Sequence, residues 1–515
     1  MNGATALLQT LLACDLDVCF TNPGTSEMHF VAALDAVPGM RALLGLSEGV
    51  VTGAADGYGR MADRPAATLL HLGPGLGNGI ANLHNARRAR TPVVNIVGDH
   101  ATHHARYDAP LQSDIEGLAR NVSGWYLESR TVTDVARDAA QAVAAAQAAP
   151  GQVATLVLPA DVCWDEGAEP AGPLPRQHRA TVATDAVEQV AKALRSGEPA
   201  AIFVGGSALR AEGLRAASAV SRATGAKLLA ETFPARLERG AGLPAVERLA
   251  YLAEFAELQL SGLRHLVLVD TRSPVSFFAY PGRSSDLVPA GCEVHVLCTG
   301  GDDVPQALQH LLDLVGGGEP ALQQALRPER PTGALTGETV AAALGALLPE
   351  GAIVSDESNT TGLWLAGATA GAPAHDWLTL TGGAIGQGMP LATGAAVACP
   401  DRPVLSIEAD GSAMYTLQAL WTQAREGLDV TTVILNNRSY AVLNMELQRV
   451  GAETTGSRAA ELFDLSRPDL DFVSLAQGMG VPATRATTAE ELTAQLERAL
   501  AEPGPHLVEA VVPPI

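Results

Sequence analysis

A carboxylate and a carboxamide stand 27 positions apart in the C-terminal part of the chain, as Asp410 and Asn437. They lie in the segments Glu408-Ala409-Asp410-Gly411-Ser412 and Asn436-Asn437. Carboxylate and amide oxygens, together with phosphate oxygens, are ligands that Mg²⁺ accepts in octahedral array. The two segments therefore suggest a site for magnesium and a diphosphate, although each segment taken alone is also typical of an ordinary turn.

The elements around these two segments form a predicted βαβ unit. Apolar runs at 404–407 and 430–435 predict two buried strands, and the segment 415–426 between them predicts an amphipathic helix. Because the crossover of a βαβ unit is right-handed, both strands end at one sheet edge, where open α/β sheets bind ligands. Asp410 and Asn437 should therefore meet, beside a helix N-terminus that favours phosphate.

Taken together, the two segments resemble the thiamin diphosphate (ThDP) signature of the family that contains acetolactate synthase, pyruvate oxidase and benzoylformate decarboxylase. The family's usual first glycine is here Ala409, a departure that should leave the ligands undisturbed. The resemblance implies ThDP and Mg²⁺ as cofactors. The metal ligands that it implies are Asp410, Asn437 and Ser439, and the further cofactor-binding residues of this motif are Gly411 and Ser412.

The N-terminal part of the chain offers the glutamate that this family uses against the cofactor's pyrimidine ring. Glu48 follows an apolar stretch and opens the Ala- and Gly-rich segment 49–60. A largely desolvated carboxyl group there favours its neutral form and can share a proton with a ring nitrogen. The other interpretation of Glu48 is an acidic residue that simply favours a helix N-terminus.

Two further N-terminal segments resemble benzoylformate decarboxylase in particular. Thr25, in Asn22-Pro23-Gly24-Thr25-Ser26-Glu27, occupies that enzyme's serine position. In 70–78, His71 and Asn78 stand where that enzyme has an active-site histidine and a pyrimidine-side asparagine. We therefore predict His71 as the acid/base residue. The glycines 73–77 alone are a weak signal for a dinucleotide loop.

Two C-terminal loops complete the predicted cofactor site. The segment 381–390 resembles the loop that wedges an apolar side chain between the two cofactor rings, with Ile385 as the wedge and Gly383 beside it. Such a wedge orients the reacting groups, although a flexible glycine linker is the alternative. In 355–360, which resembles a diphosphate-facing turn, Asn359 and Thr360 are the predicted phosphate donors.

Composition indicates a large enzyme with a small-molecule substrate. A formal charge of −22 and a pI near 4.9 would repel nucleic acid and anionic membrane surfaces. Lysine is confined to Lys192 and Lys227, away from every motif, which disfavours Schiff-base or P-loop chemistry. The scattered cysteines, the absence of an apolar run of membrane-spanning length and the non-basic N-terminus predict a cytoplasmic protein.

The pattern of elements predicts an α/β protein with three doubly wound parallel-sheet domains, separated by proline- and glycine-rich linkers. The expected ranges are 1–165 for the ThDP pyrimidine-binding domain, 182–315 for a central domain and 336–515 for the ThDP diphosphate- and Mg-binding domain. In this family Glu48 and Asp410 would approach one cofactor from different subunits. The resemblance therefore implies a homodimer or homotetramer with active sites at the subunit interface.

The resemblance implies a 2-oxo acid decarboxylase or carboligase, in which loss of CO₂ leaves an enamine that is protonated or joined to an acceptor. A ThDP-dependent 2-hydroxyacyl-CoA lyase and a non-catalytic regulatory paralogue are the alternatives. The segment after Asn437 departs from that of acetolactate synthases, and no flavin motif is evident in the central domain. His100, His103 and His104 allow three interpretations: a transition-metal site, a solvated loop, or substrate-carboxylate recognition with proton transfer.

Overall fold

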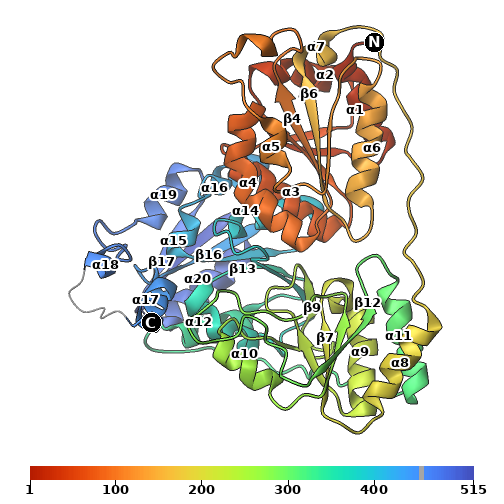
Figure 1. Cartoon of the computed structure of the whole chain (residues 1–515). Coiled ribbons are helices and arrows are strands. Elements are labelled where there is room, and N and C mark those ends of the chain that lie inside the picture. The colour runs from red at the N-terminus through yellow and green to blue at the C-terminus, as the bar shows by residue number, and fades with distance from the viewer. Residues whose placement is uncertain (452–457, 515) are drawn as a thin grey trace. The chain divides into compact units, whose positions relative to one another are not determined.

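The computed structural model describes residues 1–451 and 458–514, and the chain in it forms two compact units (Figure 1). Unit 1 consists of Met1–Arg176, Pro328–Ala368 and Leu380–Ile515, and unit 2 of Gln177–Arg327 and Thr369–Thr379. In the described part of the chain, no helix combines the length and the apolar character needed to cross a membrane.

The N-terminal part of unit 1 is a six-stranded parallel sheet in the order β2-β1-β3-β4-β6-β5, flanked by helices on both faces (Figure 1). Helices α1, α2, α6 and α7 pack their apolar residues on one face. The strands are β1 Val18–Asn22, β2 Arg41–Leu44, β3 Ala66–Leu70, β4 Val93–Asp99, β5 Trp125–Glu128 and β6 Val153–Pro159. The helices are α1 Gly3–Ala13, α2 Met28–Ala36, α3 Glu48–Ala62, α4 Leu72–Ala89, α5 Ile115–Ala119, α6 Val135–Gln147 and α7 Ala160–Trp164.

The C-terminal part of unit 1 contains parallel strands in the order β17-β18-β16-β15-β13. These strands are β13 Ile353–Glu357, β15 Val404–Ala409, β16 Val430–Asn436, β17 Ala483–Ala486 and β18 His506–Val511. The helices are α12 Gly337–Leu347, α13 Leu365–Ala368, α14 Gly388–Ala398, α15 Asp410–Ala413, α16 Ala419–Glu426, α17 Ala441–Arg449, α18 Arg458–Glu461, α19 Phe472–Gly478 and α20 Ala489–Ala501. The helix predicted at 415–426 begins only at Ala419, because residues 414–418 form turns between it and the four-residue helix α15.

Helices α3 and α14 join the two parts of unit 1 through small residues. A Cβ atom added at Gly57 would lie 2.0 Å from the Leu391 carbonyl oxygen, and one added at Gly394 would lie 1.8 Å from the Ala54 carbonyl oxygen. Only glycine therefore permits this close approach of two backbones. The packing explains the Ala- and Gly-rich composition of α3, and it places the first residue of α3, Glu48, in the same rigid framework as the loop that precedes α14.

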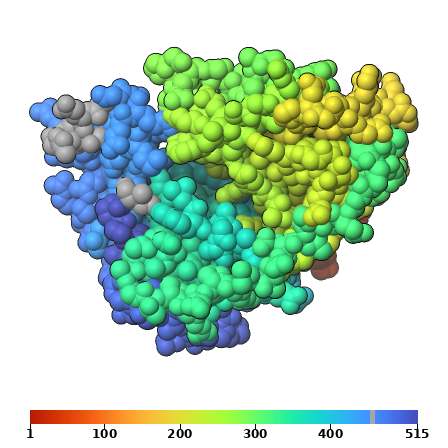
Figure 2. All heavy atoms as spheres, turned by 90° about the horizontal axis from the view of Figure 1, so that it is seen from below, coloured from red at the N-terminus to blue at the C-terminus, as the bar shows by residue number. Residues whose placement is uncertain are grey.

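Unit 2 contains a second parallel sheet in the order β10-β8-β7-β11-β12, with α8 and α11 packed side by side at its surface (Figure 1, Figure 2). The strands are β7 Ala200–Val204, β8 Lys227–Ala230, β10 Glu247–Arg248, β11 His265–Val269 and β12 Glu293–Cys298, and the helices α8 Thr184–Leu194, α9 Ala211–Thr224, α10 Ala253–Leu260 and α11 Val304–Val315. In addition, β9 Leu237–Arg239 pairs antiparallel with β14 His375–Thr379. This pairing joins segments from two of the predicted domain ranges, whose boundaries stay a prediction.

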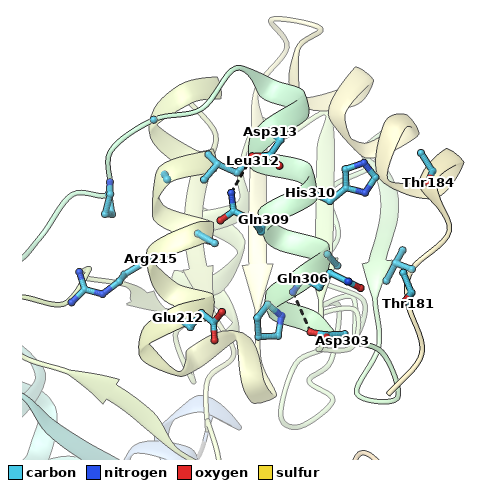
Figure 3. A pocket seen from close by; sticks show the side chains of 17 residues that line it. Thr181, Thr184, Glu212, Arg215, Asp303, Gln306, Gln309, His310, Leu312 and Asp313 are labelled. Atoms are coloured by element: carbon cyan, nitrogen blue, oxygen red, sulfur yellow. Dashed lines mark hydrogen bonds between the residues drawn. The ribbon is translucent and has the colours of Figure 1, made fainter. Parts of the chain in front are cut away.

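A groove of about 940 Å³ in unit 2 runs over α9, α11 and the loops around 181–184 and 318–320 (Figure 3). Arg215 of α9 and His310 of α11 point away from each other there, so these two side chains do not converge on one point. None of the predicted site residues lines the groove. Its size alone therefore does not make it the active site.

Candidate active site

The structure brings Asp410 and Asn437 together at the ends of β15 and β16. These strands are parallel neighbours, with Ala409 paired to Leu435. The Asp410 carboxylate accepts hydrogen bonds from the backbone N–H groups of Gly411, at 2.8 Å, and Arg438, at 2.6 Å. The Asn437 side-chain oxygen accepts one from the Ser439 N–H, at 2.9 Å. The predicted metal ligands Asp410, Asn437 and Ser439 thus lie in one cluster. Together with the predicted cofactor-binding residues Gly411 and Ser412, we name it the Asp410 group.

Asp410 is a buried carboxylate with no cationic side chain among its contacts in the described residues. Burial raises its pKa to about 6, and hydrogen bonds from backbone N–H groups offset part of that effect. A buried anion of this kind is stabilised by a metal ion that supplies the missing positive charge. The donor set of carboxylate, carboxamide and backbone oxygens fits Mg²⁺.

One short helical turn, Asn359–Trp364, carries the predicted phosphate-side residues and contacts the Asp410 group. The Asn359 side-chain amide donates to the Ser412 hydroxyl at 2.9 Å, while Asn437 donates to the Thr361 hydroxyl at 3.5 Å. Thr360 lies between these two residues in the same turn. Thr361 was not predicted, because its hydroxyl meets Asn437 only through the side-by-side placement of β13, β15 and β16.

The loop that carries Gly383 and Ile385 is held on several sides. Asn85 of α4 donates to the Ala384 carbonyl at 2.8 Å, and the Gly386 carbonyl accepts from Asn82, at 3.2 Å, and from Thr416, at 2.9 Å. These bonds from α4 and from the segment before α16 give the loop a defined conformation, unlike a flexible linker. Gly383 has a φ of 74°, which a glycine adopts without strain, and Ile385 is half-buried.

A pair of buried carboxyl groups helps to hold the same loop. Glu357 accepts hydrogen bonds from the N–H groups of Gly386, at 2.7 Å, and Gly388, at 2.6 Å. In the strand register Glu357 pairs with Glu408. Burial raises the pKa of Glu357 to about 7, and burial and the neighbouring Glu357 charge raise the pKa of Glu408 well above its ordinary range. At least one of the two groups therefore carries a proton near neutral pH. This pair was not predicted, because its signal in the sequence amounts to two acidic residues at the ends of strands.

The predicted pyrimidine-side residues also meet. Glu48 is the first residue of α3, after the helix cap Ser47, and its carboxylate accepts a hydrogen bond from Asn78 of α4 at 3.1 Å. Gly75 lies between Glu48 and His71, since a Cβ added there would be 3.4 Å from the Glu48 Oε1 and 3.5 Å from the His71 Cβ. Glu48, His71 and Asn78 therefore belong to one cluster around the start of α4.

His71 is oriented by Glu27, a residue without a predicted role. The His71 Nδ1 lies 2.8 Å from a Glu27 carboxylate oxygen, which also accepts from the Gly24 N–H at 2.7 Å. Burial raises the pKa of Glu27, while the neighbouring His71 lowers it. A proton on Nδ1 leaves Nε2 as the atom that accepts or donates a proton. Together with Glu48 and Asn78, these two residues form what we name the Glu48 group.

Thr25, the third predicted catalytic residue, lies one residue after Gly24 in the short turn Thr25–Glu27 and is exposed. The Gly24 backbone touches the His71 ring, because an added Cβ atom would lie 2.3 Å from it. Thr25 therefore directly follows Gly24, the residue that contacts the predicted acid/base histidine, His71. No hydrogen bond from the Thr25 side chain is formed within the described residues.

Strained backbone marks three of the predicted motifs. Leu72, Asn359 and Arg438 have positive φ angles of 48°, 50° and 58°. Asn359 is itself a predicted site residue. Leu72 directly follows His71, and Arg438 directly follows Asn437. Residues other than glycine seldom adopt this conformation, and it costs of order 1–3 kcal/mol at functional sites.

The remaining histidine-rich segment does not form a three-ligand cluster. His100 and His104 rings lie 5.2 Å apart, whereas the His103 Nδ1 lies 3.7 Å from Asp161. Within residues 1–451 and 458–514, no group of three metal-ligating side chains converges there. The transition-metal interpretation of this segment therefore receives no support.

The chain belongs to the thiamine pyrophosphate enzyme family. Residues 1–119 match the N-terminal TPP binding domain of that family, and residues 360–510 match its C-terminal TPP binding domain. The predicted family and the predicted ThDP cofactor are thereby confirmed.

The similarity to several named proteins extends over nearly the whole chain. The chain is 63% identical over 515 residues to a Mycobacterium tuberculosis protein named "Putative acetolactate synthase large subunit IlvX", covering 100% of this chain and 99% of that protein. It is 31% identical to benzoylformate decarboxylase of Pseudomonas aeruginosa, with 96% of each protein covered. The structure of a ThDP-dependent 4-hydroxybenzoylformate decarboxylase from Rhodococcus jostii superposes with a TM-score of 0.87 at 24% identity, covering 100% of this chain and 99% of that one. This last similarity confirms the α/β fold with three parallel-dominant sheets.

Proposed function

We propose that the protein is a ThDP- and Mg²⁺-dependent 2-oxo acid decarboxylase or carboligase. The observation that carries the proposal is the Glu48 group, in which an oriented histidine and a second carboxyl group lie around the start of one helix. The relatives named as acetolactate synthase and benzoylformate decarboxylase support the same class of reaction.

ThDP, when bound, supplies a nucleophilic carbon and an electron sink for decarboxylation. In our proposal Asp410, Asn437 and Ser439 hold Mg²⁺, and the Asn359–Thr361 turn faces the phosphates. Ile385, on a loop that α4 holds in place, would pack against the cofactor's two rings. These residues orient the reacting groups and exclude water.

Two acid groups divide the proton chemistry in this proposal. Glu48 shares a proton with a cofactor ring nitrogen. His71, oriented by Glu27 through Nδ1, gives or takes a proton at Nε2. Thr25 lies near the same space, because its turn follows Gly24, which touches the His71 ring. With this histidine, the residues of the site can protonate the product. Protonation then leads to release of an aldehyde.

The experiment that tests the function is a substrate panel. The protein, with ThDP and Mg²⁺, is incubated separately with pyruvate, benzoylformate and branched 2-oxo acids, while CO₂ is recorded and the organic product is identified by mass. CO₂ with an aldehyde supports a decarboxylase, and CO₂ with a coupled hydroxyketone supports a carboligase. Absence of CO₂ from every acid, with ThDP bound, would overturn the proposal in favour of acyl-CoA cleavage or a silent paralogue.

We also propose a homodimer or homotetramer whose sites combine the Glu48 group of one subunit with the Asp410 group of another. Glu48 is only half-buried in the single chain, and no hydrogen bond among the described residues joins Glu48, Asn78 or His71 to Asp410, Asn437 or Ser412. Co-expression of two inactive variants, Glu48→Gln and Asp410→Ala, tests this. Random pairing into dimers should restore about a quarter of the activity, because half of the dimers are mixed and each mixed dimer has one intact site. Sites built within one chain would give no recovery.

Reduced cysteines support a cytoplasmic location, which we propose as well. Cys14, Cys19, Cys163 and Cys298 are buried thiols that form no disulfide. Buried free thiols of this kind are typical of a protein in a reducing compartment.

A further inference from the structure

Three side chains near the start of β11 and β12 in unit 2 place metal-ligating atoms close together. His265 is the first residue of β11, while Glu293 and His295 lie on β12, at the edge of the sheet. In the parallel register His265 pairs with Glu293, and Val267 pairs with His295. Because alternate residues of a strand face the same side, all three side chains project from one face of the sheet.

The distances between the three ligand atoms are those of a small metal site. The His265 Nδ1 lies 3.0 Å from the His295 Nε2, and a Glu293 carboxylate oxygen lies 3.9 Å from each of these nitrogens. Ligands bound at about 2.0–2.1 Å to a tetrahedral ion are roughly 3.3–3.4 Å apart, a value that these distances bracket. We propose that His265, Glu293 and His295 bind one Zn²⁺ or similar divalent transition-metal ion, with water as the fourth ligand.

A second carboxylate supports this assignment. The other ring nitrogen of His265, Nε2, lies 3.1 Å from a Glu198 carboxylate oxygen. A carboxylate that accepts the N–H of a ligating histidine fixes the tautomer, so that the opposite nitrogen presents its lone pair to the metal. Here that nitrogen is Nδ1, the atom that faces His295 and Glu293. The Glu198 contact therefore orients His265 for ligation.

The surroundings of the two imidazoles also suit a metal ion. His265 is buried, with 9% of its surface exposed, and His295 is half-buried. Across residues 1–451 and 458–514, these three side chains are the one group of three histidine, cysteine or acidic residues whose ligand atoms all converge within 4.8 Å. The ion would join the edge strand β12 to β11 and so stabilise this sheet.

The test uses the full-length protein with ThDP and excess Mg²⁺, so that the cofactor site is saturated. Co²⁺ is titrated while its visible absorption is recorded, and Zn²⁺ affinity is then measured by competition. We expect one ion per chain with the intense absorption of a tetrahedral, nitrogen-ligated Co²⁺. His265→Gln and His295→Ala should each weaken binding by about 100-fold or more, and Glu198→Gln by roughly 10-fold.

Matched controls separate this site from other metal-binding groups. His310→Gln, a change in the same unit on α11, should leave the affinity unchanged. Asp410→Asn should also leave it unchanged, which would exclude binding of the transition metal at the magnesium site. Absence of tetrahedral absorption in the wild-type protein would overturn the proposal, as would unchanged affinity in folded His265→Gln protein. If His295→Ala does not fold, the more conservative His265→Gln and Glu198→Gln variants decide the question.

Discussion

The Asp410 group and the Glu48 group place their acids in opposite ways. Asp410 is 1% exposed and receives two backbone hydrogen bonds before any ligand arrives, whereas Glu48 is half-buried and is held by a single amide, that of Asn78. Burial raises the pKa of Asp410, so that binding of a cation to this carboxylate is favourable. The half-exposed carboxyl group of Glu48 remains partly solvated until another surface covers it. In our proposal, the metal site is therefore complete within one chain, whereas the proton-transfer site becomes complete only when a partner subunit covers it.

The largest predicted effect concerns the Glu48 side of this comparison. Glu48→Gln keeps the shape and the contact with Asn78 but removes the exchangeable proton, so turnover should fall by about 10²–10⁴-fold. ThDP binding, measured by calorimetry, should change little, because the diphosphate and metal contacts come from the Asp410 group. Unchanged turnover would remove Glu48 from its proposed role.

The second prediction tests the Asp410 side. Mg²⁺-dependent ThDP binding should weaken about tenfold for each pH unit below about 6, where Asp410 takes up a proton and loses its charge. Asp410→Asn should bind the cofactor weakly at every pH, without this pH dependence. Calorimetric titrations at several pH values check both statements. An equal pH dependence in the variant would assign the titration to another group.

The third prediction concerns Glu27, which acts through His71. Glu27→Gln should lower kcat by roughly 10- to 100-fold and shift the pH profile, because the amide cannot fix the Nδ1 proton as a carboxylate does. Glu27→Asp keeps the charge and should recover part of the activity. Steady-state rates across pH measure the effect. A variant whose pH profile is that of the wild type would show that Glu27 only supports packing.

The smallest predicted effect is on stability and arises from the Glu357 and Glu408 pair. Both folded-state pKa values lie above the ordinary value of 4.5, so the folded protein holds more protons than the unfolded chain. The stabilising contribution is therefore complete below pH 4.5 and is lost as the pH rises through about 7. In urea unfolding, Glu408→Gln should reduce this loss, whereas the exposed control Glu350→Gln should behave as the wild type.

The sequence alone determined much of the architecture and half of the candidate site. Apolar runs and linkers predicted the α/β class, and the βαβ unit placed Asp410 beside Asn437, because the geometry of a parallel crossover follows from local rules. The strand ranges 404–407 and 430–435 fall within β15 and β16. Motifs within single loops, such as those of Ile385 and Asn359, were visible for the same reason.

Only the tertiary structure decided which distant segments complete these motifs. Glu27 and His71 are 44 positions apart, and Thr361 and Asn437 are 76 apart, so their contacts depend on strand order and register. The histidines show the same limit. The clustered His100, His103 and His104 form no three-ligand site, while His265 and His295, 30 positions apart, are brought together by the pairing of β11 with β12. Spacing along a chain predicts a contact only where one local element connects the residues; elsewhere the register of the sheet determines it.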